Sequence, residues 1–141
     1  MRLTAFSLLA LLGLGGCSGE ADRTLFSSLD AAGAGLDFEN RLEESQEVNV
    51  FTFRHFFNGA GVGVGDVDGD GRPDVFLTAN QGPNRLFLNR TESGGPIQFE
   101  DVTEAAGVAG TRAWSTGVSV ADVDGDGRLD LYVANAGAVD G

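Results

Sequence analysis

The sequence predicts an all-β fold, a partial β-propeller built from four-stranded antiparallel blades. An internal repeat is the main observation behind this prediction, because residues 61–79 recur at 117–135 with 11 of 19 positions identical. Glycine supplies 22 of the 141 residues, about twice its usual share, which indicates many tight turns. The third observation is a series of short apolar runs between turn signals, each long enough for one strand.

The first repeat divides into four predicted strands. The strand at 61–65 leads into an acidic loop, and the apolar strand at 75–79 follows that loop. Two more strands are predicted at 85–89 and 97–103, because each apolar run follows a turn signal, Gly-Pro-Asn and Glu-Ser-Gly-Gly-Pro respectively. Four strands in a repeat of about 40–60 residues are typical of one propeller blade.

The second repeat is predicted to contain strands at 114–121 and 131–134. Trp114 opens a period-two series in the first of these strands, which predicts one packed face. Because propellers typically have about four to eight blades, we expect this chain to be a fragment of a larger propeller.

The region before the repeats is acidic. Residues 36–49 carry four glutamates and few apolar positions, which favours a solvated loop or a short helix over an acidic binding patch. The valines and phenylalanines at 48–53 predict a strand. The predicted organisation is a signal peptide at 1–16, a tether at 17–35, a strand and loop region at 36–59, a first repeat at 60–113 and an incomplete second repeat at 114–141.

The first 17 residues predict export. Arg2 precedes a 14-residue apolar run, which is shorter than the roughly 20 residues of a transmembrane helix and suits a signal peptide. The run ends in Leu-Gly-Gly-Cys, which resembles the bacterial lipobox, so Cys17 is the expected lipidation site and the expected membrane contact. An ordinary signal peptide followed by a free thiol is the alternative. We expect an outer-membrane or other cell-envelope lipoprotein, or an extracellular protein.

The charge is strongly negative, with 21 acidic against 9 basic residues and a net charge of −12. Such a surface repels phosphate, which argues against a nucleic-acid partner. A single cysteine excludes intrachain disulfides and cysteine-based zinc or iron–sulfur sites. A metal ion is the simplest cationic partner.

Each repeat contains a loop in which aspartates alternate with other residues. Carboxylates at the first, third and fifth positions converge on one point, glycine at the sixth permits a sharp turn, and the seventh offers its backbone carbonyl. The predicted ligands are Asp66, Asp68, Asp70, Arg72 and Asp74 in the first loop, and Asp122, Asp124, Asp126, Arg128 and Asp130 in the second. We expect both arginine side chains to point outward.

Oxygen ligands of this number predict two Ca²⁺ sites rather than Mg²⁺, Zn²⁺ or copper sites. The loop begins like an EF-hand, but an EF-hand requires a glutamate at its twelfth position. Leu77 and Val133 stand there, which excludes that family and the dockerins.

The motif Asp-x-Asp-x-Asp-Gly-x-x-Asp between a glycine-rich and an apolar strand resembles the FG-GAP/VCBS repeat of integrin-α-type β-propellers. The segments 59–62, 84–89 and 99–108 are similar to its cartilage-acidic-protein/ASPIC-type branch, which is abundant among bacterial secreted proteins. The resemblance covers residues 56–137. It implies that the ion lies in the hairpin between the first two strands of a blade and has a structural role.

Three other signals point to chemistry only weakly. The glycines at 59–66 superficially match a phosphate-binding loop, but an acidic loop rather than a helix follows them. His55, the only histidine, lies among phenylalanines, so a packed or interfacial imidazole is favoured over a general base. Trp114 is expected in the core, with sugar stacking as the alternative.

We therefore expect a non-catalytic, calcium-stabilised module that binds a protein or glycan through loops at one end of the propeller. One alternative is the N-terminal part of an extracellular enzyme, for instance a polysaccharide-degrading one, whose catalytic residues lie outside this chain. The other is a structural spacer.

Overall fold

The structure, a computed structural model, describes residues 25–110 and 113–138. The predicted signal peptide and Cys17 lie outside these residues. The elements are β1 (Val62–Gly65), β2 (Asp74–Leu77), β3 (Arg85–Asn89), β4 (Phe99–Asp101), α1 (Thr103–Ala106), β5 (Ala113–Ala121) and β6 (Asp130–Ala138). The prediction of an all-β fold, part of a β-propeller, is confirmed. In the described part of the chain, no helix is long and apolar enough to cross a membrane.

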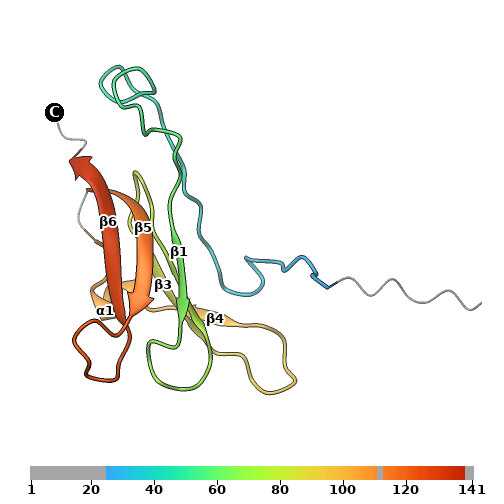
Figure 1. Ribbon diagram of the computed structural model, residues 1–141. Helices are drawn as coiled ribbons and strands as arrows, with labels where there is room; N and C mark the ends of the chain where they lie inside the picture. Colours follow the sequence, from blue (N-terminus) through green and yellow to red (C-terminus); the bar gives the residue numbers. More distant parts are fainter. Residues whose placement is uncertain (1–24, 111–112, 139–141) are drawn as a thin grey trace, which may run out of the picture.

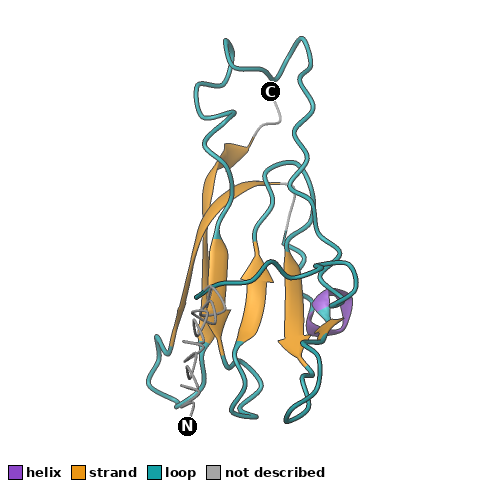
Figure 2. Cartoon of the chain, turned by 90° about the vertical axis from the view of Figure 1, so that its right-hand side faces the viewer, coloured by secondary structure: helices purple, strands orange, loops and turns teal. Residues whose placement is uncertain are grey.

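The first four strands form one antiparallel sheet in chain order, as expected for a blade. Gly65 pairs with Asp74 across β1 and β2, and Phe76 pairs with Leu86 across β2 and β3. Phe76, Leu86 and Phe87 are buried and form the centre of the core. The short helix α1 lies beside this sheet (Figure 2), where the Thr103 hydroxyl accepts a 2.9 Å hydrogen bond from the Leu86 N–H.

The second repeat contributes the hairpin β5–β6, which packs against β1 (Figure 1). This packing explains the alternating glycines of β1. A Cβ atom at Gly63 would lie 2.8 Å from Cγ2 of Val120, and one at Gly61 would lie 2.6 Å from the carbonyl oxygen of Thr116. Side chains at these positions would therefore collide with β5. The glycines permit two strands to approach closely and do not form a phosphate loop.

The predicted strand at 48–53 is wrong, because this segment folds into successive turns. The Asn49 side chain causes the first turn, since its Oδ1 accepts hydrogen bonds from the N–H groups of Phe51 at 2.9 Å and Thr52 at 3.3 Å. The backbone carbonyl of Asn49 also accepts one from the Phe53 N–H at 2.8 Å. Local side-chain acceptors thus satisfy backbone donors that a strand would have paired with a neighbour.

The turns carry aromatic side chains onto the start of β5. The rings of Phe53 and Phe56 lie 4.9 and 5.4 Å from that of Trp114, which is 1% exposed. The prediction that Trp114 is packed is confirmed, and its burial rules out sugar stacking from solvent. His55 is exposed rather than packed in the core. Its ring meets Phe53 edge-on, and its Nδ1 lies 2.9 Å from the side-chain nitrogen of Asn58.

The chain before these turns contacts the first sheet at two places, the edge strand β4 and the loop that follows β2. The Phe99 N–H at β4 donates a 2.8 Å hydrogen bond to the Ala34 carbonyl. Asn40 and Asn80 form a further pair of hydrogen bonds, at 2.7 and 3.0 Å. Residues 36–49 contain no helix, so of the two predicted alternatives the loop, and not the short helix, is found. The domain boundaries themselves remain predictions.

Candidate metal centres

The first acidic loop joins β1 to β2, and three of its aspartates converge. One carboxylate oxygen from each of Asp66, Asp68 and Asp74 lies within 4.8 Å of the others. The antiparallel pairing of the two strands brings the first and ninth loop positions together, since Gly65 lies opposite Asp74. The hairpin therefore places the predicted first, third and ninth ligands around one point.

Asp66 organises the loop backbone. Its Oδ1 accepts hydrogen bonds from the N–H groups of Gly69 at 2.8 Å and Asp70 at 3.0 Å, and its Oδ2 accepts one from Gly71 at 2.8 Å. Gly71 has a φ of 86°, a conformation that side chains rarely adopt. The sixth-position glycine predicted from the sequence is thus explained by backbone geometry.

Asp74 is the most deeply buried acid of this loop, at 1% exposure. Its Oδ2 accepts a 2.8 Å hydrogen bond from the Val67 N–H, and its Oδ1 accepts a 2.8 Å bond from the Asn89 N–H. The first bond closes the loop and the second attaches it to the end of β3. Backbone donors therefore pair both oxygens of this buried carboxylate.

Asp70 does not join the cluster. Its Oδ1 accepts a 2.9 Å hydrogen bond from the Arg72 N–H, and its Oδ2 pairs with the Arg72 guanidinium. The Arg72 Nε in turn donates to the carbonyl of Asn89 at 2.7 Å. The expectation that Arg72 points outward is therefore wrong, because two acceptors lie within reach along the loop and β3.

The second loop, between β5 and β6, repeats this arrangement at the same end of the molecule (Figure 1). Asp122, Asp124 and Asp130 converge within 4.8 Å. Asp126 again stays outside the cluster and pairs with Arg128, whose Nη2 lies 2.6 Å from its Oδ2. This hydrogen bond lowers the pKa of the Asp126 carboxyl. The Arg128 side chain is 83% exposed, in agreement with the expected outward direction.

Arg90 was missed by the sequence analysis. It follows β3, and its Nη1 lies 3.0 Å from Oδ2 of Asp68 and 3.7 Å from Oδ2 of Asp70. Its Nε donates a 2.8 Å hydrogen bond to Glu100 on β4. That bond, aided by Asp68, raises the pKa of the guanidinium. No motif marks Arg90, because its proximity to the loop arises only when β3 pairs with β2.

The donor sets fit a hard divalent cation. Each described cluster consists of three carboxylates, without histidine or cysteine, and such oxygen ligands favour Ca²⁺ or Mg²⁺ over zinc and copper. The acidic clusters could thus hold a metal ion. Leu77 and Val133 lie on β2 and β6, where neither can ligate.

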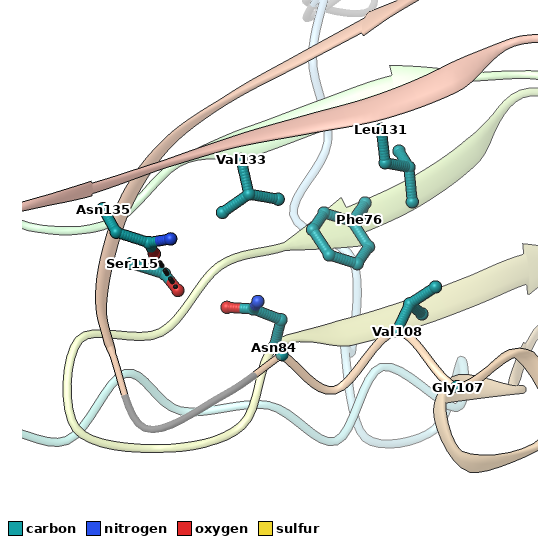
Figure 3. Close-up of a pocket in the computed structure, with 9 residues that line it drawn as sticks. Phe76, Asn84, Gly107, Val108, Ser115, Leu131, Val133 and Asn135 are labelled. Atoms are coloured by element: carbon teal, nitrogen blue, oxygen red, sulfur yellow. Dashed lines mark hydrogen bonds between the residues drawn. The ribbon is translucent and has the colours of Figure 1, made fainter.

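A separate pocket lies between the two sheets (Figure 3). Its walls include Phe76 and Val108 on one side and Leu131 and Val133 on the other. The hydroxyl in this lining, that of Ser115, donates to Oδ1 of Asn135 at 2.9 Å. None of the lining residues is an acid, a base or a thiol, so the pocket offers no pair of nucleophile and base.

Comparison with known proteins agrees with this geometry. The FG-GAP-like repeat family matches residues 66–133. Cartilage acidic protein 1 of Homo sapiens is 35% identical over 80 residues, which make up 57% of this chain and 12% of that protein. Its Xenopus tropicalis counterpart is 31% identical over 80 residues, and that of Mus musculus 35% over 77, with similar coverage.

The chain thus spans about 12% of the length of these relatives, and no solved structure matches it. The matched segment runs from the first aspartate of the first loop into β6, and so contains both acidic loops. Residues 66–133 of this chain are therefore similar to an FG-GAP-like repeat.

Proposed function

We propose that the chain is a non-catalytic β-propeller module whose two acidic loops bind Ca²⁺ as a structural ion. The observation that carries this proposal is the recurrence of one three-carboxylate cluster in the same hairpin of both repeats. Carboxylates within 4.8 Å of one another repel, and a cation at their centre would remove that repulsion.

The ligands in this proposal are the three clustered aspartates of each loop. The fifth-position aspartates and the carbonyls of Arg72 and Arg128 are the additional ligands that the sequence predicts. A bound Ca²⁺ would supply positive charge, and the loop residues would supply its oxygen ligands and so hold the β-hairpins closed around it.

Calorimetric titration of the whole chain with Ca²⁺ in a non-ionic detergent tests the proposal. We expect two sites with dissociation constants of about 10⁻⁴–10⁻³ M, the range of extracellular modules. Asp68→Asn and Asp124→Asn should each remove one site. Lack of Ca²⁺ uptake at millimolar concentration would contradict the proposal.

Export and a lipid anchor at Cys17 complete the proposed role, in which loops at one end of the propeller bind a protein or glycan outside the cytoplasm. The support is the sequence of the first 17 residues. Fractionation of the Cys17→Ser variant tests the anchor, since that variant should stay unprocessed or leave the membrane fraction. If Cys17→Ser fractionates and migrates like the parent, the lipid anchor is contradicted and an ordinary signal peptide is the remaining explanation.

A further inference from the structure

Arg90 places a fixed positive charge on the first acidic loop. Its guanidinium contacts Asp68, a member of the three-carboxylate cluster, and reaches toward Asp70. Glu100 holds the other edge of the same guanidinium from β4, at 2.8 Å. The side chain is thus fixed between the outer strands and the loop, which reduces the entropy lost when it pairs with Asp68.

The second loop has no such charge in the part of the chain that the structure describes. Arg128 forms its ion pair with Asp126, as Arg72 does with Asp70 in the first loop. The two loops are otherwise alike in their clustered aspartates and in the backbone bonds to Asp66 and Asp122. Arg90 therefore distinguishes two sites whose own sequences nearly coincide.

We propose that Arg90 is an internal counter-cation that competes with a divalent ion for Asp68 and so weakens metal binding at the first site. This inference rests on the proposed function. Without metal, the guanidinium offsets part of the repulsion among the loop carboxylates. When an ion enters, Asp68 exchanges its arginine partner for the metal, and Arg90 remains attached to Glu100.

The size of the effect follows from Coulomb's law. Repulsion between a single and a double positive charge about 5 Å apart in water, screened by 0.1 M salt, corresponds to about a three- to tenfold change in affinity. Removing the charge of Arg90 should strengthen binding at the first loop by that factor. The difference should shrink as salt is added, because exposed charges are screened.

Calcium titration of Arg90→Gln by calorimetry tests the inference in the whole chain, in a non-ionic detergent. Asp122→Asn and Asp124→Asn are present in every variant, so that only the first loop is measured. Arg85→Gln is the matched control, because Arg85 forms a 2.9 Å ion pair with Asp101 at the other end of the same strand pair. Arg85→Gln removes the same charge as Arg90→Gln, but at a position distant from the loop.

We expect Arg90→Gln to bind Ca²⁺ about three- to tenfold more tightly at 0.1 M salt. Arg85→Gln and the charge-conserving Arg90→Lys should stay within about twofold of the parent. In EDTA, Arg90→Gln should also melt at a lower temperature than Arg90→Lys, since the metal-free loop has lost its counter-charge.

Equal calcium affinity of the parent and Arg90→Gln would overturn the inference and leave the proposed function standing. An equal gain in calcium affinity in Arg90→Gln and Arg90→Lys would overturn the inference too, because the shape of the side chain rather than its charge would then determine the affinity. Failure of the parent and of all three variants to take up Ca²⁺ would overturn the proposed function together with the inference.

Discussion

The two repeats share the sequence of their first hairpin but differ in what surrounds it. In the first repeat, Asp74 is 1% exposed and receives hydrogen bonds from both its own loop and β3. In the second, the equivalent Asp130 is partly exposed and receives one bond, a 3.0 Å hydrogen bond from the Val123 N–H, among the described residues. A short acidic sequence therefore determines the loop, whereas the neighbouring strands determine how strongly it is held.

The largest expected difference concerns the inner strands β1 and β5. Gly63 faces β5 closely, whereas its counterpart Ser119 is exposed. Gly63→Val should destabilise the chain by about 3 kcal/mol, because the new side chain would overlap Val120. Ser119→Val should change stability by less than about 0.5 kcal/mol. Urea denaturation measures both, and equal effects would show that β1 does not pack against β5 in solution.

The next difference concerns the ninth loop position. Asp74→Ala leaves two backbone donors without an acceptor and should cost about 2–4 kcal/mol, whereas Asp130→Ala should cost about 1 kcal/mol. Denaturation in EDTA isolates this effect from metal binding. If Asp130→Ala were as costly as Asp74→Ala, the second loop would be braced by residues outside those that the structure describes.

A smaller effect concerns the pH dependence of stability, to which Asp101 on the outer strand β4 contributes. Partial burial raises the pKa of Asp101, but hydrogen bonds from Thr103 and the charge of Arg85 outweigh it, so the pKa is lowered overall. A carboxyl whose pKa is lowered by folding stabilises the protein above its unfolded pKa of about 3.9. That contribution disappears as the pH falls through the lower, folded value.

Asp101→Asn should therefore reduce stability at pH 7 by about 1 kcal/mol and weaken the pH dependence of stability below about pH 5. Thermal melts between pH 3 and pH 7 provide the measurement, and Asp37→Asn, an exposed site, serves as the control. The same dependence of melting temperature on pH in the parent and Asp101→Asn would contradict this account.

The smallest expected effect concerns self-association. In the described residues, β6 pairs only with β5, and Tyr132 on it is 68% exposed. Strands with one free edge are prone to pair with other chains. We expect the chain to associate through the second repeat, more strongly in EDTA. Tyr132→Lys should reduce light scattering more than Val64→Lys on β1, and equal reductions would exclude β6 as the contact.

The sequence alone determined the elements within each repeat. Each of β1 to β4 overlaps a strand predicted from apolar runs and turn residues, but the strand predicted at 97–103 ends at Asp101 and Thr103 begins α1 instead. The aspartate spacing predicted the clusters around Asp66 and Asp122. These features depend on residues close together in the chain. The same local reasoning failed at 48–53, because an alternating pattern there did not reveal that Asn49 would satisfy the backbone through turns.

Only the tertiary structure decided which loop receives hydrogen bonds and ion pairs from a neighbouring strand, and which glycines are required for close strand packing. Arg90 and Asn89 reach the first loop because β3 pairs with β2, and Gly63 is needed because β5 crosses it. Phe53 and Phe56 contact Trp114, which lies more than 55 residues later in the chain. Such contacts join distant segments whose individual patterns carry no information about their partner, so only packing in three dimensions reveals them.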